Sequence, residues 1–327
     1  MPQDSVTYGV TRIRCHEKEL LRPANLQRML EGDAQEAVRN LVDLGYGGLP
    51  DATAADAERL VTSALSAAYA LVKEISFEPA VTDVFLLKAD VHNLKILLKL
   101  RLTASTEAPA LLRGGVYEPE ALAHMVEAAA YKELPPQFQA ALDALERDFQ
   151  SGVDPARIST ALDGAYVQYA YDTKHPLVTA YFKALADFDN VLTMLRLKQM
   201  GGAAERLREL LLPAGDIPHS ALIAGLEAPA EALQRLVSVG PAAPGIRKGL
   251  EALQNGEGLS ALERERDDYL MGCFNHARYD NKSIAPVVAY LLAREQEALC
   301  VRLILTAKRN GLSDRIITER LRTLYGW

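Results

Sequence analysis

The spacing of the apolar residues constrains the fold of this chain more than any other feature. From Val91 onward, Leu94, Leu97, Leu98 and Leu102 recur three and four residues apart, with basic residues between them. This is the period of one face of an α-helix. Proline and glycine cluster between such runs, and the alternating Val and Ile runs that are typical of strands are hard to find. The sequence therefore predicts an all-α protein.

Size and composition narrow the class of protein further. The chain has 327 residues, 49% of them hydrophobic and 24% charged, which is a globular composition long enough for two or three domains. Three cysteines are too few for a disulfide scaffold and favour a reducing compartment. A net charge of -7 argues against nucleic-acid binding, which needs a concentrated basic face. The longest uncharged stretch, residues 60–72, is too short to cross a bilayer, and no secretory signal is expected.

A short polar motif recurs along the chain. Asp90 and Asn93 form an Asp-x-x-Asn unit followed by an apolar residue, and Asp187 and Asn190 form a second one. We interpret Glu295 as the start of a degenerate third copy, so that the three copies are 97 and 108 residues apart. A repeat of about a hundred residues is too long for a solenoid and suits a small helical domain.

A second repeat agrees with this period. Leu111-Leu112-x-x-Gly115 has a counterpart displaced by 100 positions, Leu211-Leu212-x-x-Gly215. We therefore predict three related helical domains, at residues 1–106, 107–206 and 207–327.

Basic residues follow the polar motif at fixed distances. Lys99 and Arg101 lie nine and eleven residues after the first Asp, and Arg196 and Lys198 follow the second Asp at the same distances. Acidic groups near the start and basic groups near the end of a helix complement its dipole, so one interpretation is helix stabilisation with interhelix hydrogen bonds. The other is a row of polar side chains that lines a concavity shared by the three domains and binds a partner.

Motifs for catalysis and metal binding fail on inspection. His16 is followed four residues later by Leu20 instead of a second histidine, which excludes the zinc-protease pattern. Gly240 and Gly245 have the spacing of a phosphate loop, but Ile246 stands where lysine is required. We expect no catalytic residue, no cofactor, no metal and no direct small-molecule substrate.

The ordered set of motifs resembles a known family, the C subunits of the V-type and A-type ATPases, which are relatives of the d subunit of eukaryotic V-ATPases. The resemblance covers nearly the whole chain, and these segments carry it: residues 8–14, 20–21, 45–47, 88–94, 186–190 and 289–297. The third copy departs from the pattern, because Glu295 replaces Asp and Ala298 replaces Asn.

The resemblance implies a non-catalytic rotor subunit of an ATP synthase or ion-pumping ATPase. Its three domains are expected to form a funnel with approximate threefold pseudo-symmetry, peripheral to the membrane on the cytoplasmic side. The funnel would connect central-stalk subunits D and F to the membrane rotor proteolipid ring and so couple ATP hydrolysis or synthesis to proton or sodium transport. A freestanding helical scaffold that binds soluble partners is the alternative.

The resemblance supplies no site residues, so the candidate partner-binding set comes from the repeats, with Arg302 added from the basic C-terminal segment. Polar side chains can line a socket without leaving a large apolar patch on the free subunit. We expect the basic members to position the stalk electrostatically. The candidates are Asp90, Asn93, Lys99, Arg101, Asp187, Asn190, Arg196, Lys198 and Arg302.

Overall fold

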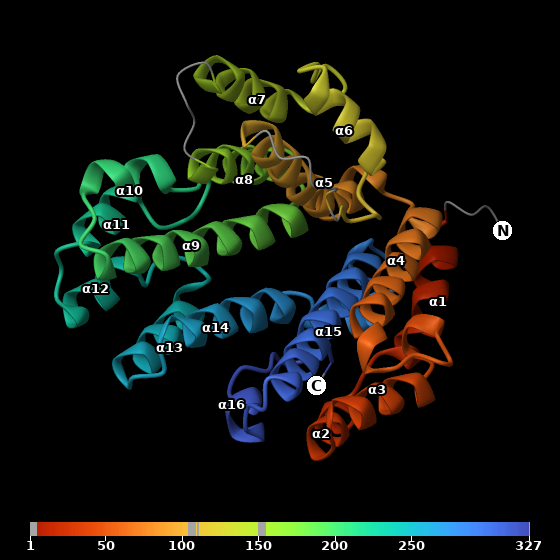
Figure 1. Cartoon of the computed structure of the whole chain (residues 1–327). Helices are drawn as coiled ribbons and strands as arrows, with labels where there is room; N and C mark the ends of the chain where they lie inside the picture. The colour runs from red at the N-terminus through yellow and green to blue at the C-terminus, as the bar shows by residue number, and fades with distance from the viewer. Residues whose placement is uncertain (1–4, 104–108, 110, 150–154, 327) are drawn as a thin grey trace. The chain divides into compact units, whose positions relative to one another are not determined.

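Three long helices of nearly equal length recur in the fold, and each has a proline in its first turn. They are α5 (Pro79–Leu102), α9 (Pro176–Gln199) and α15 (Ala285–Arg309), as Figure 1 shows. Proline is favoured there because the first N–H groups of a helix have no partner within it. The structure is a computed structural model that describes residues 5–103, 109, 111–149 and 155–326.

The other helices are shorter and lie before, between and after these three in the sequence. They are α1 (Val6–His16), α2 (Pro23–Glu31), α3 (Ala34–Asp43), α4 (Ala57–Ile75), α6 (Pro119–Glu127), α7 (Pro136–Phe149), α8 (Pro155–Asp172), α10 (Ala204–Leu210), α11 (His219–Gly225), α12 (Ala230–Val237), α13 (Ala243–Gln254), α14 (Leu259–Gly272) and α16 (Asp314–Thr318), with short 3-10 helices η1 (Glu17–Glu19), η2 (Tyr46–Gly48), η3 (Ala54–Asp56) and η4 (Asn275–Tyr279). The described residues contain no strand. The predicted all-α class is confirmed.

The chain divides into two compact units. Unit 1 combines residues 1–82 with residues 267–327, and unit 2 comprises residues 83–266. The predicted boundaries at 106 and 206, and the funnel with threefold pseudo-symmetry, stay predictions.

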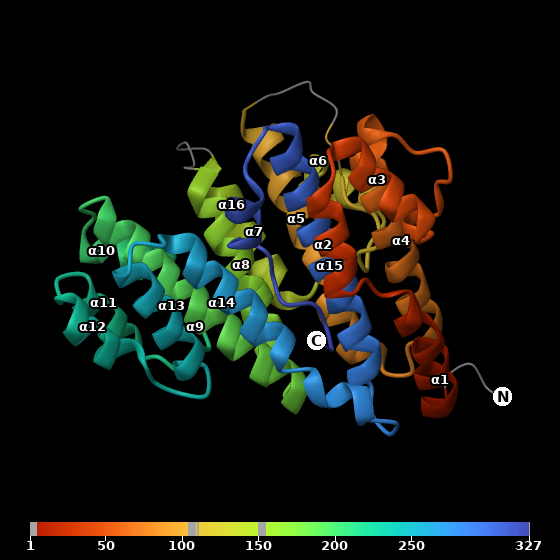
Figure 2. The same ribbon diagram turned by 90° about the horizontal axis from the view of Figure 1, so that it is seen from below.

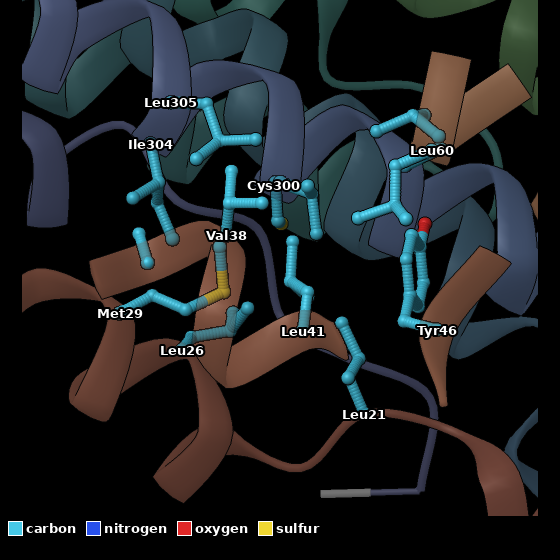
Figure 3. Close-up of a cluster of buried hydrophobic side chains, with 14 of the residues drawn as sticks. Leu21, Leu26, Met29, Val38, Leu41, Tyr46, Leu60, Cys300, Ile304 and Leu305 are labelled. Atoms are coloured by element: carbon cyan, nitrogen blue, oxygen red, sulfur yellow. The ribbon is translucent and has the colours of Figure 1, made fainter. Parts of the chain in front are cut away.

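Unit 1 has a core to which both ends of the chain contribute. Figure 3 shows Leu26 and Met29 from α2 and Val38 from α3 packing toward Cys300 and Ile304 of α15. α4 also packs along α15 in this unit. Burial of these apolar side chains stabilises the contact by about 1.5–3 kcal/mol for each large one. The N-terminal helices are thus held by a helix more than 250 residues later in the sequence.

Unit 2 is organised by α9 and its neighbours. α10 and α11 pack against α9, and α12 packs on α11; the view of Figure 2 shows these short helices grouped together. At the α8 contact, the rings of Tyr166 and Phe182 meet edge to face with centroids 5.0 Å apart. The Tyr166 hydroxyl donates to the Val84 carbonyl at 2.9 Å, so a single side chain links the start of α5 to α9.

Candidate functional site

The first Asp-x-x-Asn motif holds a loop segment, residues 112–117, against α5. Asn93 donates to the Leu112 carbonyl and accepts from the Leu112 N–H, both at 2.8 Å. Asp90 accepts from the N–H groups of Val116 at 2.6 Å and Tyr117 at 3.3 Å. Both polar side chains are buried, so their polar atoms serve the backbone of this loop.

The second motif does the same on α9. Asn190 donates to the Leu212 carbonyl at 3.0 Å and accepts from the Leu212 N–H at 2.7 Å. Asp187 accepts from the Ile217 N–H at 2.9 Å. The Leu-Leu-x-x-Gly repeat is therefore the binding partner of the Asp-x-x-Asn repeat, a connection that the sequence analysis missed although it identified both.

The glycine of each loop lets the backbone approach the carboxylate. A Cβ atom built on Gly115 would lie well inside 3.0 Å of Asp90 Oδ1, and one built on Gly215 would do the same at Asp187 Oδ1. Glycine is the residue that permits such an approach. Both loops therefore need glycine at this position, because any side chain there would overlap the carboxylate.

The third copy of this arrangement lies two residues later than predicted. Asp90 and Asp187 each lie eleven residues after the first-turn proline of their helix, and the eleventh residue after Pro286 is Glu297. Glu297 is buried and accepts from the Leu21 N–H at 2.6 Å. Glu295, the predicted equivalent, instead accepts from the Tyr69 hydroxyl.

The error has a topological cause. In the first two copies the loop that the carboxylate holds follows the long helix, whereas the third loop belongs to the N-terminal part of the chain. The order of loop and helix along the sequence is therefore reversed in the third copy, and no loop after α15 marks the position of its carboxylate. We call the three arrangements modules: module 1 (α5, residues 112–117, α6), module 2 (α9, residues 212–217, α11) and module 3 (α15, residues 20–22, α2).

A basic residue in each module caps the short helix. Arg101, Lys198 and Lys308 all lie 22 residues after the first-turn proline. Arg101 donates to the Val126 carbonyl at the end of α6, and Lys308 donates to the Leu30 carbonyl at the end of α2.

Lys198 makes the most extensive cap. Its Nζ donates to the carbonyls of Gly225 at 3.0 Å, Leu226 at 2.7 Å and Ala228 at 2.7 Å. The last carbonyls of a helix lack partners within it and carry a partial negative charge, which a cation there stabilises. All three modules thus use a cation in the same way.

The other predicted basic residues link each long helix to a neighbour. Lys99 donates to Ser159 Oγ on α8 at 3.0 Å. Arg196 pairs with Glu263 on α14, and Arg302 donates from Nε to both oxygens of Glu58 on α4 at 3.0 Å.

Each of the nine predicted residues therefore takes part in a module or in a contact between two helices, and the contacts are separate from one another. Asp90, Asn93, Asp187 and Asn190 are buried, and Arg196 is the exposed member of the set. These contacts agree with the first interpretation, in which the residues stabilise helices and make hydrogen bonds between elements of the chain. Partner binding by the nine residues stays a prediction.

Burial perturbs two of the carboxyl groups that hold loops. It raises the pKa of Asp187 to about 6, against the opposing effect of its backbone hydrogen bonds. Among the described residues, Asp187 Oδ2 has no hydrogen-bond partner. Burial also raises the pKa of Glu297 to about 7, although Arg294 pairs with it at 2.8 Å. Both groups favour the neutral form more than an exposed carboxyl does.

Two further kinds of feature were sought in the described part of the chain, a metal site and a membrane span. This part contains no group of three or more His, Cys, Asp or Glu side chains that could hold a metal ion. None of its helices combines the length and the apolar character that a bilayer span requires.

Comparison with known proteins places this geometry in a family. Residues 9–320 match the ATP synthase (C/AC39) subunit family. The C subunit of the V-type sodium ATPase of Enterococcus hirae is 22% identical over 96% of this chain and 97% of its own length. The C subunit of the A-type ATP synthase of Desulfurococcus is 25% identical over 96% of this chain and 89% of its own, and that of Methanosarcina acetivorans is 24% identical over 96% and 92%. The chain therefore belongs to the ATP synthase (C/AC39) subunit family, whose members are non-catalytic subunits of V-type and A-type ATPases.

Proposed function

We propose that this chain is the rotor subunit that connects central-stalk subunits D and F to the membrane proteolipid ring. It would thereby couple ATP hydrolysis or synthesis to proton or sodium transport, on the cytoplasmic side of the membrane. The observation that carries the proposal is the family match along residues 9–320. Relatives of similar length are named as the C subunits of a V-type sodium ATPase and of A-type ATP synthases.

The modules support a mechanical role. A coupling part must transmit torque without deforming, and close-packed helices deform little. In each module a buried carboxylate and a capping cation attach a short helix to a long one. We infer that the three modules are the repeated elements of a funnel with approximate threefold pseudo-symmetry.

Co-purification tests the proposal directly. The tagged chain is expressed with subunits D and F and the proteolipid ring of the same organism, and it is expected to retain both the stalk and the ring. In inverted membrane vesicles, added protease should digest the chain, because the cytoplasmic face is outside. A chain that binds neither stalk nor ring would instead be a freestanding helical scaffold.

We also propose that the predicted basic residues position the stalk electrostatically, and Arg196 offers the sharpest test. R196E breaks the ion pair with Glu263, whereas the double variant R196E/E263R restores an ion pair and reverses the charge at both positions. If Arg196 acts on the stalk, both variants weaken stalk binding, more strongly at low salt.

Arg302 and Glu58 form a matched second pair for the same design. If the R302E/E58R swap restores the stalk affinity that R302E loses, the pair serves only the contact between α15 and α4. The same outcome at Arg196 would remove the electrostatic role from the proposal and leave the connecting role intact.

A further inference from the structure

Module 3 is completed by both ends of the chain. On α15, Glu297 holds the Leu21 N–H, and the thiol of Cys300, one turn later, donates weakly to the Arg322 carbonyl at 3.7 Å. Cys300 occupies the position of Asn93 and Asn190, three residues after the carboxylate. The Arg322 carbonyl therefore takes the place on α15 that the Leu112 carbonyl takes on α5.

The polar contacts of residues 320–326, which we call the tail, extend over several elements of unit 1. Arg322 Nε pairs with Asp267 at 2.9 Å, and the two side chains are only 12% and 13% exposed. The Thr323 N–H donates to Asp268 Oδ1 at 2.7 Å. Arg278 donates to the Gly326 carbonyl at 2.8 Å. The tail has no helical structure of its own over residues 321–324, so these contacts hold it.

Apolar contacts join the tail to the same core as the N-terminal loop. Leu324 is 4% exposed and belongs to the cluster that contains Leu21 and Leu26. Tyr325 is 6% exposed. Loss of the tail would thus remove Leu324 from the apolar cluster to which Leu21 and Leu26 belong.

We propose that the tail is a latch that completes module 3. In modules 1 and 2 an asparagine fixes the loop with two hydrogen bonds to one residue. Module 3 lacks that asparagine, and the latch supplies the missing restraint through Arg322, Thr323 and Leu324. Without the latch, residues 20–31 loosen from α15 while modules 1 and 2 stay closed. This holds whether or not the chain acts in a rotor.

Amide hydrogen exchange measured by mass spectrometry on the full chain tests the latch. R322D is expected to accelerate exchange in residues 20–31 about tenfold or more, because the free energy of local opening there falls. Residues 112–117 and 212–217 should keep their rates. The double variant R322D/D267R should restore slow exchange in residues 20–31. R315A is the matched control, because it removes the exposed pair between Arg315 of α16 and Glu319, the residue that follows this helix. It should leave those rates unchanged.

A chain ending at Glu319 gives a second, independent measurement. It should show the same fast exchange in residues 20–31, and a synthetic peptide of residues 320–326 added in excess should slow it again. Faster exchange confined to residues 320–326 in R322D would overturn the proposal, as would unchanged rates in residues 20–31 of the shortened chain. If the shortened chain does not fold, the test rests on R322D and on the double variant R322D/D267R. Faster exchange in all three modules of R322D would also overturn the proposal.

Discussion

Asn190 and Leu212 exchange two hydrogen bonds, at 3.0 Å from Asn190 Nδ2 to the Leu212 carbonyl and at 2.7 Å from the Leu212 N–H to Asn190 Oδ1. One buried side chain thereby satisfies both polar groups of one backbone residue. Asn93 and Leu112 repeat this relationship in module 1. Because the loop is not part of a helix or sheet, these amides take the role that regular secondary structure has elsewhere.

N190A should destabilise the chain by roughly 2–4 kcal/mol, because it leaves a buried N–H and a buried carbonyl without partners. The measurement is the free energy of unfolding in urea. Q199A, on the exposed end of the same helix, is the control and should change it by less than about 0.5 kcal/mol. A loss no larger than that of Q199A would show that the hydrogen bonds are dispensable.

G215A should destabilise the chain by about 1–3 kcal/mol, because its new Cβ would overlap Asp187 Oδ1 and force the loop outward. G164A in α8 is a matched control, since the nearest atom to its new Cβ is 3.9 Å away. That substitution should be neutral or stabilise by up to about 1 kcal/mol through helix propensity. Thermal unfolding of both variants is the measurement: G215A should lower the unfolding temperature, whereas G164A should leave it unchanged or raise it. Equal effects would refute the close approach of the Gly215 backbone to Asp187.

The stability of the chain should depend on the ionisation of Asp187. Its pKa is raised from 3.8 to about 6 in the folded state, so between these values the unfolded state has lost a proton that the folded state keeps. Stability from this group is full below pH 4 and falls as the pH rises through 6, by up to about 3 kcal/mol. Above about pH 7 the contribution is nearly constant.

D187N removes this ionisation while keeping an acceptor for the Ile217 N–H. The free energy of unfolding of D187N, relative to that of wild type, should therefore be larger at pH 7 than at pH 4. Urea unfolding at both pH values measures it. Parallel stability profiles of the two proteins from pH 4 to pH 7 would contradict the raised pKa.

K198M should destabilise module 2 by about 1.5–3 kcal/mol, because the end of α11 loses the charged donor to three carbonyls while the apolar stem is kept. Hydrogen exchange in residues 219–229 should accelerate, and exchange in residues 119–128 of module 1 should not. K174M, at a turn before α9, serves as the comparison. If residues 219–229 exchange at the same rate in K198M and wild type, the cap is unimportant.

The sequence predicted the helices because their apolar spacing is local, and it predicted a repeat because two modules run in the same order along the chain. It did not reveal that Asn93 contacts Leu112, since nothing in a sequence states which repeat faces which. It also placed the third motif at Glu295 instead of Glu297, because the loop of that module lies at the other end of the chain. The burial of Asp90 and Asp187 could not be predicted from the sequence, since a polar motif has the same pattern whether it faces a loop or a partner.

The separation of Leu21 and Glu297 by 276 residues has a consequence for biosynthesis. At roughly 5–20 residues per second, a ribosome needs on the order of half a minute to make the partner of the first loop. Modules 1 and 2 can close as soon as their own segments emerge, but residues 20–31 must wait for α15. The N-terminal segment of the nascent chain is therefore the part that a chaperone would need to shield, and a stalled ribosome would leave it exposed.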